Sequence, residues 1–307
     1  MEHDAVTEST ETGATLGRRI IVAAFDGWND AGEAATSAIE HLLGETEYET
    51  VLAVDPELYF DYQYTRPTVE NDGEGGRRLK WPEAVLRRPV APRPGGTEFW
   101  ILTGVEPARA WQAFAAEFID VALREDVTGL VTLGSMMADV PHTRPISIFA
   151  GSDNDALRRT LGLERSAYEG PVGILSVLGD AAERAGIPMA SLWASVPHYV
   201  AGHTPSPKAT LALLDRLEEL AAADVPRGTL AAEAAAWEAT IDAAAADDDE
   251  MREYIRQLEQ QRDTVDAPEA SGDAIAQAFE SYLRRSDGRD GRDGRDGRDG
   301  RPDGRSR

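Results

Sequence analysis

Apolar stretches rich in β-branched and aromatic residues alternate with stretches of helical periodicity along most of the chain. Such alternation predicts βαβ units, in which strands pair in parallel and helices pack on the sheet. The stretches are apolar at both odd and even positions, as expected where helices cover both faces of a sheet. The pattern predicts an α/β fold, a three-layer sandwich with a mostly parallel sheet. The expected strands are residues 18–27, 48–55, 97–104, 128–135, 146–152, 170–178 and 190–199.

Three stretches have the 3.6-residue periodicity of amphipathic helices. Residues 29–44 are expected to start with Asn29 or Asp30 as the N-cap, and residues 106–125 carry Pro107 at their start. The third helix, 206–223, follows the last strand and has a proline in its first turn. The intervening segment from position 55 to 96 is long and rich in Pro, Gly and charge, which predicts an extra hairpin or a flap.

Beyond the third helix the apolar residues keep a three-four spacing from Leu230 to Leu258, interrupted at Asp248. This pattern is typical of a coiled coil or a helical hairpin, which could bind a partner or lie back on the domain. A further helix is expected at 272–285, and the Gly-Arg-Asp repeat after it lacks apolar residues and is expected to be disordered. The predicted organisation is a disordered lead-in 1–17, an α/β domain 18–223, a helical extension 224–285 and a disordered tail 286–307.

The chain has 307 residues, a formal net charge of -24 and no cysteine. The charge argues against binding to nucleic acid or to an anionic membrane, since both need clustered positive charge. No apolar stretch approaches the roughly 20 residues needed to cross a bilayer, and the first residues resemble neither a signal nor a transit peptide. A chain without cysteine cannot use disulfides or thiolates, which indicates the reducing cytoplasm.

Polar residues follow the ends of the first, fourth and last expected strands. Because the carboxyl ends of parallel strands meet at one edge of a sheet, where ligands bind, we expect these residues to share that edge. Carboxylate, imidazole and guanidinium groups together could support acid-base chemistry, anion binding or a protein interface. The candidate cleft or interface residues are Asp26, Trp28, Asn29, Asp30, Ser135, Asp139, His142, Thr143, Arg144, His198 and Tyr199.

Structural roles explain several of these residues equally well. Asp26 and its following glycine are a common turn pair, and the prolines at 141 and 145 stiffen a loop that would suit an interface as well as a catalyst. His198 and His203 lack a third ligand at a characteristic spacing. The sequence has no phosphate loop, dinucleotide glycine pattern, nucleophile elbow or paired-histidine zinc helix. We therefore predict no catalytic residue, no cofactor and no metal.

Five segments, in order between about positions 19 and 223, closely resemble the proteasome assembly chaperone family, also called the PAC2-like family. The resemblance is strongest to its actinobacterial branch. The segments are "FDGWNDAGEAA", "LGSMMADVPHTRP", "YEGPVGILSVL", "SLWASVPHYVAG" and "SPKATLALL". The resemblance implies a phosphorylase-like sandwich with a C-terminal helical extension. It also implies self-association, as a homotrimer or another homo-oligomer, and a non-enzymatic chaperone role with proteasome α-subunits as possible partners.

Some relatives in this family bind α-subunits through a C-terminal tripeptide of a hydrophobic residue, Tyr and any residue. This sequence ends in "GRSR", so we expect any such contact to use another surface. The alternative function is a small-molecule-binding protein or an enzyme, similar to ATP-grasp or carboxylate-amine ligases, that uses the cleft at the strand ends. Lys80 and Lys208 lie outside the pattern that an ATP-grasp enzyme needs. A third possibility is a structural oligomer whose helical arm recruits an unknown partner.

Overall fold

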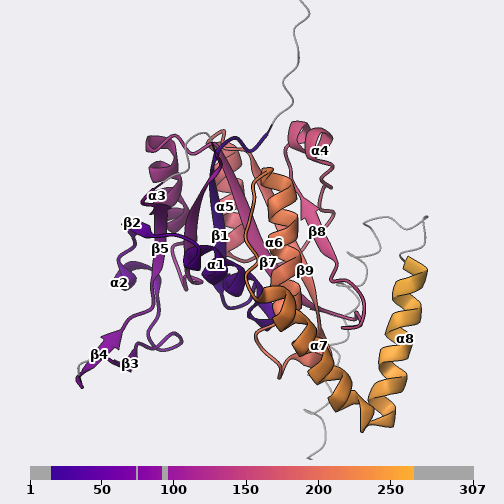
Figure 1. The fold of residues 1–307 in the computed structure, drawn as a ribbon. Coiled ribbons are helices and arrows are strands. Elements are labelled where there is room, and N and C mark those ends of the chain that lie inside the picture. Colours follow the sequence, from indigo (N-terminus) through magenta and orange to yellow (C-terminus); the bar gives the residue numbers. More distant parts are fainter. Residues whose placement is uncertain (1–14, 74, 92–95, 266–307) are drawn as a thin grey trace, which may run out of the picture.

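The computed structural model describes residues 15–73, 75–91 and 96–265 (Figure 1). At its centre is a seven-stranded sheet with the order β2-β5-β6-β1-β7-β9-β8. Strands β6, β1, β7 and β9 pair in parallel, whereas β5 and β8 are antiparallel to their neighbours. The strands are β1 (Arg19–Asp26), β2 (Tyr48–Ala53), β5 (Ala84–Pro89), β6 (Glu98–Val105), β7 (Gly129–Ala138), β8 (Ile148–Gly151) and β9 (Met189–Pro197).

Helices cover both faces of this sheet (Figure 1). Alternate residues of β1 face opposite layers, so that Val22 packs with α1 and α6 on one side while Ile21 packs with α3 and α5 on the other. This arrangement confirms the predicted three-layer α/β sandwich with a mostly parallel sheet. The helices of the two layers are α1 (Ala34–Gly44), α6 (Pro207–Ala221), α3 (Trp111–Arg124) and α5 (Ile174–Arg184). Shorter helices are η1 (Ala31–Glu33), α2 (Pro56–Tyr59), α4 (Asp155–Leu161) and η2 (His198–Val200).

The expected strand at 170–178 is wrong, because its apolar part forms the first turns of helix α5. Ile174, Leu175 and Leu178 are all buried on one face of that helix. A short apolar run fits a buried strand or a buried helix equally well, and only the packing against the sheet distinguishes them.

The segment from 55 to 96 contains more structure than the predicted hairpin or flap. The hairpin is confirmed as a separate two-stranded sheet of β3 (Thr68–Asn71) and β4 (Arg77–Lys80). Strand β5, which the sequence analysis missed, joins the main sheet through the buried run that begins at Ala84. Its apolar part is short and two arginines follow it, so the usual strand signal is weak.

The two crossover helices begin later than expected. The first starts at Ala34, after a turn of η1, and the second starts at Trp111 rather than next to Pro107. Ala110 precedes that second helix with φ 55°, a left-handed conformation that does not continue a helix. Pro207 does lie in the first turn of α6, as predicted.

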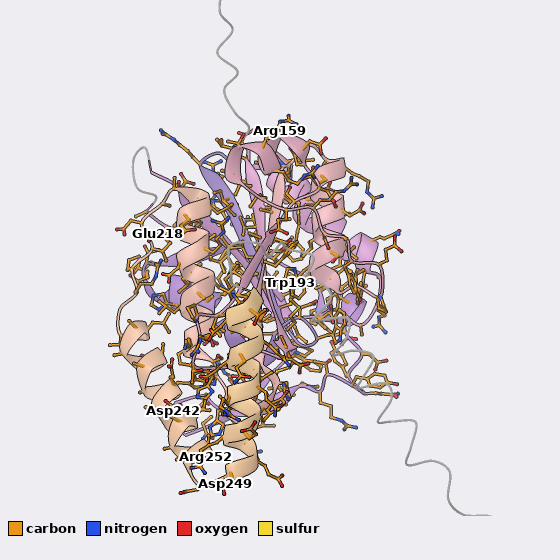
Figure 2. The ribbon with its side chains drawn as sticks, turned by 90° about the vertical axis from the view of Figure 1, so that its right-hand side faces the viewer. Arg159, Trp193, Glu218, Asp242, Asp249 and Arg252 are labelled. Carbon is orange, nitrogen blue, oxygen red and sulfur yellow. The ribbon has the colours of Figure 1, made fainter. Side chains whose placement is uncertain are left out.

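Two helices lie in the region of the expected extension, α7 (Leu230–Ala246) and α8 (Asp249–Val265). They form a V that closes near Asp249 (Figures 1 and 2). The break coincides with Asp248, whose carboxylate accepts hydrogen bonds from the first backbone N–H groups of α8. Helix α7 lies back on the domain, because Leu230 and Ile241 are buried in the same cluster as α1 and α6.

Leu16 is 2% exposed and packs in the core, so the last residues of the expected lead-in belong to the folded body. The expected helix 272–285, the tail 286–307 and most of the lead-in fall outside the described residues. The domain boundaries therefore remain predictions. Among the described helices, none has the length and apolar character needed to span a membrane.

Candidate functional site

The strand ends that precede the candidate residues do meet at one edge. Strand β1 pairs with β7, and β7 pairs with β9 up to the register of Ala138 with Pro197. Just beyond β1, Ser135 of β7 donates its backbone N–H to the carbonyl of Asn29 at 2.8 Å and its hydroxyl to the carbonyl of Ala31 at 2.8 Å. The register therefore places the polar segments together as the sequence predicted.

Asp30 supports the start of helix α1. Its Oδ1 accepts hydrogen bonds from the backbone N–H groups of Ala35 at 2.7 Å and Thr36 at 3.2 Å, and its Oδ2 accepts from the Thr36 hydroxyl. The side chain is buried, and this burial raises the pKa of the Asp30 carboxyl, although the hydrogen bonds oppose the rise. The N-cap position of α1 is Glu33, so the expectation of Asn29 or Asp30 as its N-cap is wrong. The Asp30 carboxylate nevertheless binds N–H groups in the first turn of α1, a supporting role rather than a catalytic one.

Replacing Asp30 by Ala should therefore lower the free energy of unfolding by about 2 kcal/mol, because two helical N–H groups lose their acceptor. Asp30→Asn keeps an acceptor oxygen and should lose less than half as much. Urea unfolding of both variants measures the difference. Equal losses would show that the negative charge, not the capping geometry, is what the site requires.

Asn29 is also buried, and it connects β1 to the start of α5. Its Nδ2 donates to Glu106 Oε1 at 3.1 Å, and the same oxygen accepts the backbone N–H of Ile174 at 2.8 Å. A Cβ on Gly173 would lie 2.3 Å from Asn29 Nδ2, so only glycine allows this approach. The sequence analysis missed Glu106 and Gly173, because their role depends on contacts between distant segments. The two other residues of this group, Asp26 and Trp28, are exposed.

His142 has a fully buried side chain between two partners. Its backbone N–H donates to Tyr199 Oη at 2.7 Å, its Nδ1 lies 2.8 Å from the same Oη, and its Nε2 lies 3.1 Å from Asp242 Oδ1 on α7. A neutral imidazole with its proton on Nε2 satisfies all three contacts, since the Tyr199 hydroxyl then donates to Nδ1. Burial lowers the pKa of His142, and Asp242 partly opposes this effect. Burial also raises the pKa of the Tyr199 hydroxyl.

Arg144 and Thr143 bind helix α8. The Arg144 guanidinium donates to both carboxylate oxygens of Asp263, at 2.8 and 2.9 Å, and to Glu259 at 3.2 Å. The Thr143 hydroxyl donates to Glu259 as well. The hydrogen bonds with Asp263 raise the pKa of the guanidinium and lower the pKa of the Asp263 carboxyl. A two-bond Arg–carboxylate pair fixes both orientation and register.

His198 completes this second group of contacts. Its Nδ1 lies 3.4 Å from Asp139 Oδ1, and its Nε2 lies 3.5 Å from the Tyr254 hydroxyl on α8. Figure 2 shows Asp242 on α7 in the lower part of the molecule, where α8 begins at Asp249. Within the described ranges, no three His, Asp or Glu side chains gather as metal ligands.

The candidate residues thus divide by their contacts. Asn29 and Asp30, with Ser135, support the starts of helices α5 and α1. The loop after β7 and the residues after β9 bind α7 and α8. We name this second surface the helix-docking surface, and its members are Asp139, His142, Thr143, Arg144, His198 and Tyr199. Whether these residues also bind a ligand or a partner stays a prediction.

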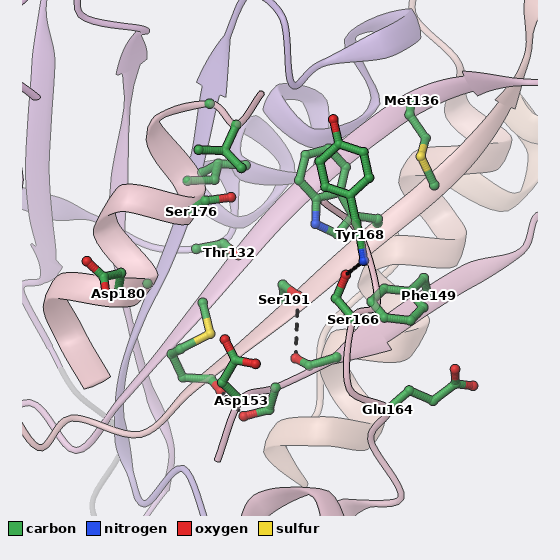
Figure 3. A pocket seen from close by; sticks show the side chains of 18 of the residues that line it. Thr132, Met136, Phe149, Asp153, Glu164, Ser166, Tyr168, Ser176, Asp180 and Ser191 are labelled. Carbon is green, nitrogen blue, oxygen red and sulfur yellow. Dashed lines mark hydrogen bonds between the residues drawn. The ribbon is translucent and has the colours of Figure 1, made fainter. Parts of the chain in front are cut away.

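A cavity of about 830 Å³ opens beside α5, on the face of the sheet opposite α6 (Figure 3). Its floor comes from the strands β7, β9 and β8, with Thr132, Ser191 and Phe149 among them. The Trp193 ring, which also lines the cavity, packs closely over Gly134, where a Cβ would lie 2.7 Å from it. Other lining residues include Trp28, Met136, Tyr168 and Val172. Of the residues that the sequence analysis named as cleft or interface candidates, Trp28 and Asp30 line this cavity.

Comparison with known proteins identifies the family. The model of the PAC2 family matches residues 24–245. A PAC2 family protein from Streptomyces avermitilis is 43% identical, with a TM-score of 0.71, and the match covers 76% of this chain and 98% of that one. The Mycobacterium tuberculosis proteasome-assembly chaperone homologue Rv2125 is 41% identical, with a TM-score of 0.69, and the match covers 77% and 99% of the two chains.

A more distant structure shares the fold alone. PbaB of Pyrococcus furiosus, an archaeal proteasome activator, is 17% identical with a TM-score of 0.57, and the match covers 74% of this chain and 93% of that one. No curated protein matches the chain. The two actinobacterial structures and the family model agree with the resemblance found in the sequence. The chain belongs to the PAC2 family.

Proposed function

We propose that this protein is a non-enzymatic chaperone-like protein that binds protein partners, with proteasome α-subunits among them. Two findings support the proposal: the chain belongs to the PAC2 family, and a relative that is 41% identical is named a proteasome-assembly chaperone homologue. In keeping with the predictions from the sequence, the proposal includes self-association as a homotrimer or another homo-oligomer, a cytoplasmic location, and no binding to nucleic acid or membrane.

The observation that carries the proposal is the use of the strand edge as a helix-docking surface. His142 and Arg144, two of the candidate cleft or interface residues, both bind carboxylates on helices of the same chain. The buried imidazole binds a carboxylate of α7 and the bidentate guanidinium binds a carboxylate of α8, and such contacts are typical of protein recognition. The strand edge is therefore suited to bind protein segments.

Affinity purification of the tagged full chain from a native lysate of its source, followed by mass spectrometry, tests this function. We expect recovery of proteasome α-subunits or their precursors above a control with the tag alone. Purified α-subunits mixed with the protein should also give a complex in native mass spectrometry. If no α-subunit is recovered with the tagged chain above the control, and no complex forms at tens of micromolar of each purified protein, the proposal is refuted.

A further inference from the structure

The cavity beside α5 has an aromatic floor. Phe149 of β8 and Trp193 of β9 are paired in register, so they lie on the same face of the sheet, and both line the cavity. Two thioether side chains, Met136 and Met189, line it as well. Aromatic rings and methionine sulfur atoms make favourable contacts with other ring systems. The floor is therefore suited to a flat, largely apolar ring compound.

The charged groups of the lining leave no unpaired cation in the cavity. The lining contains five carboxylates and two guanidinium groups, and each guanidinium pairs with a carboxylate, Arg184 with Asp180 and Arg165 with Asp153. The excess carboxylates repel an anionic ligand. A cationic ligand would lose its hydration on the apolar floor, and the carboxylates of these two pairs are already matched by the guanidinium groups. These charges favour a neutral ligand.

Thr132 gives the cavity a specific polar contact. This residue of β7 lines the cavity and is only 1% exposed. Among the residues that the structure describes, none forms a hydrogen bond with its hydroxyl group. Figure 3 shows Thr132 on the side of the cavity next to α5, near Ser176. Because a buried hydroxyl without a partner is costly and can donate a hydrogen bond, an acceptor on a ligand would bind it there.

We propose that this cavity binds a neutral, planar ring compound that carries a carbonyl or another hydrogen-bond acceptor. The rings lie on the Phe149–Trp193 floor, and the acceptor receives a hydrogen bond from the Thr132 hydroxyl. The volume of about 830 Å³ is typical of small-molecule sites. No member of the helix-docking surface lines the cavity, so the site is separate from the surface on which the proposed function rests. The inference goes beyond that function and does not depend on it.

Titration of the full chain with two-ring probes, followed by ligand-observed NMR, tests the class of ligand. Coumarin is neutral and has a ring carbonyl, and it should bind with a dissociation constant of about 1 mM, as expected for so small a compound. The anion coumarin-3-carboxylate and the cation 1-methylquinolinium should bind at least about tenfold more weakly. The inference is overturned if coumarin does not bind at several millimolar, or if either ion binds as tightly as coumarin.

Replacing Thr132 by Val tests the polar contact, because valine keeps the shape of the side chain and removes the hydroxyl. The affinity for coumarin should fall about fivefold. The affinity for naphthalene, which has no acceptor, should not fall. Thr103→Val on β6, outside the cavity lining, is the matched control and should change neither affinity. Unchanged coumarin binding in Thr132→Val would show that the hydroxyl is not the contact and would overturn this assignment.

Replacing Ser176 by Trp tests the location, because the new ring occupies the cavity beside α5. Coumarin and naphthalene should no longer bind to this variant. Gln112→Trp, the same kind of change at an exposed position in the first turn of α3, should keep wild-type binding. Since Ser176 and Gln112 are both exposed, thermal unfolding should confirm that both variants fold. Wild-type affinity in Ser176→Trp would place the binding elsewhere. Failure to recover proteasome subunits would leave all these affinities unaffected.

Discussion

A chain that ends after Ala223 should lose about 5 kcal/mol of its free energy of unfolding, because helix α7 completes the core around α6. Leu230 and Ile241 are 7% and 4% exposed and belong to the cluster that contains Leu213 and Leu217 of α6. Burial of each large aliphatic side chain contributes about 2 to 3 kcal/mol, and removal of α7 also exposes the side chains beneath it. Denaturant unfolding followed by circular dichroism measures the loss.

A chain that ends after Asp248 is the matched control, since it lacks α8 and everything after it but keeps α7. Helix α8 binds the helix-docking surface through ion pairs such as that of Arg144 with Asp263, and it also buries Ile255 and Leu258, which are 7% and 3% exposed. We expect this truncation to cost less than the longer one, because these two side chains lie outside the core cluster that α7 completes around α6. Equal losses in the two truncated chains would show that α8, not α7, stabilises the domain.

Replacement of His142 by Ala should lower the free energy of unfolding by about 4 kcal/mol, since it removes a fully buried ring and leaves the Tyr199 hydroxyl without one of its partners. Asp242→Asn keeps an acceptor for the Nε2 proton and should cost about 1 kcal/mol. Chemical unfolding of both variants near pH 8 measures these losses. A loss below 1 kcal/mol for His142→Ala would contradict the buried hydrogen-bonded arrangement.

The same residue should make stability depend on pH. Because burial lowers the pKa of His142 in the folded protein below its usual 6.5, the unfolded chain binds more protons in the window just below pH 6.5. Stability should therefore fall as the pH drops from about 6.5 toward the folded pKa, by at most about 1.4 kcal/mol per unit for one proton. His142→Gln should remove this part of the dependence, and identical pH profiles for the two proteins would contradict it.

Local sequence patterns predicted most of the helices and strands. The four strands of the parallel centre, β1, β6, β7 and β9, were each visible as an apolar run between helical segments. Pro207 and Asp248 marked a helix start and a helix break. The two errors share a cause. The run in α5 and the strand β5 are short, and a short apolar run has the same pattern in either structure or is too weak to detect.

The candidate site was predictable in part. The sequence placed the residues after β1, β7 and β9 at one edge because parallel strands order their ends, and the observed register confirms this. The sequence did not reveal that these residues form two groups, one that binds the starts of α1 and α5 and one that binds α7 and α8. That division depends on which segments pack together, and their functional roles stay predictions.

The sequence by itself indicated the family through five segments that resemble it. It also determined the order of most elements and the edge at which the polar segments meet, because these follow from contacts between near neighbours and from the rules of parallel sheets. Only the tertiary structure decided the partners of His142 and Arg144, which lie 100 and 119 positions away in Asp242 and Asp263. It also decided the cavity, whose lining combines residues from β7, β8, β9 and α5. Contacts between residues far apart in the sequence, and cavities, leave no periodic pattern in a single sequence. They can therefore be seen only in the folded structure.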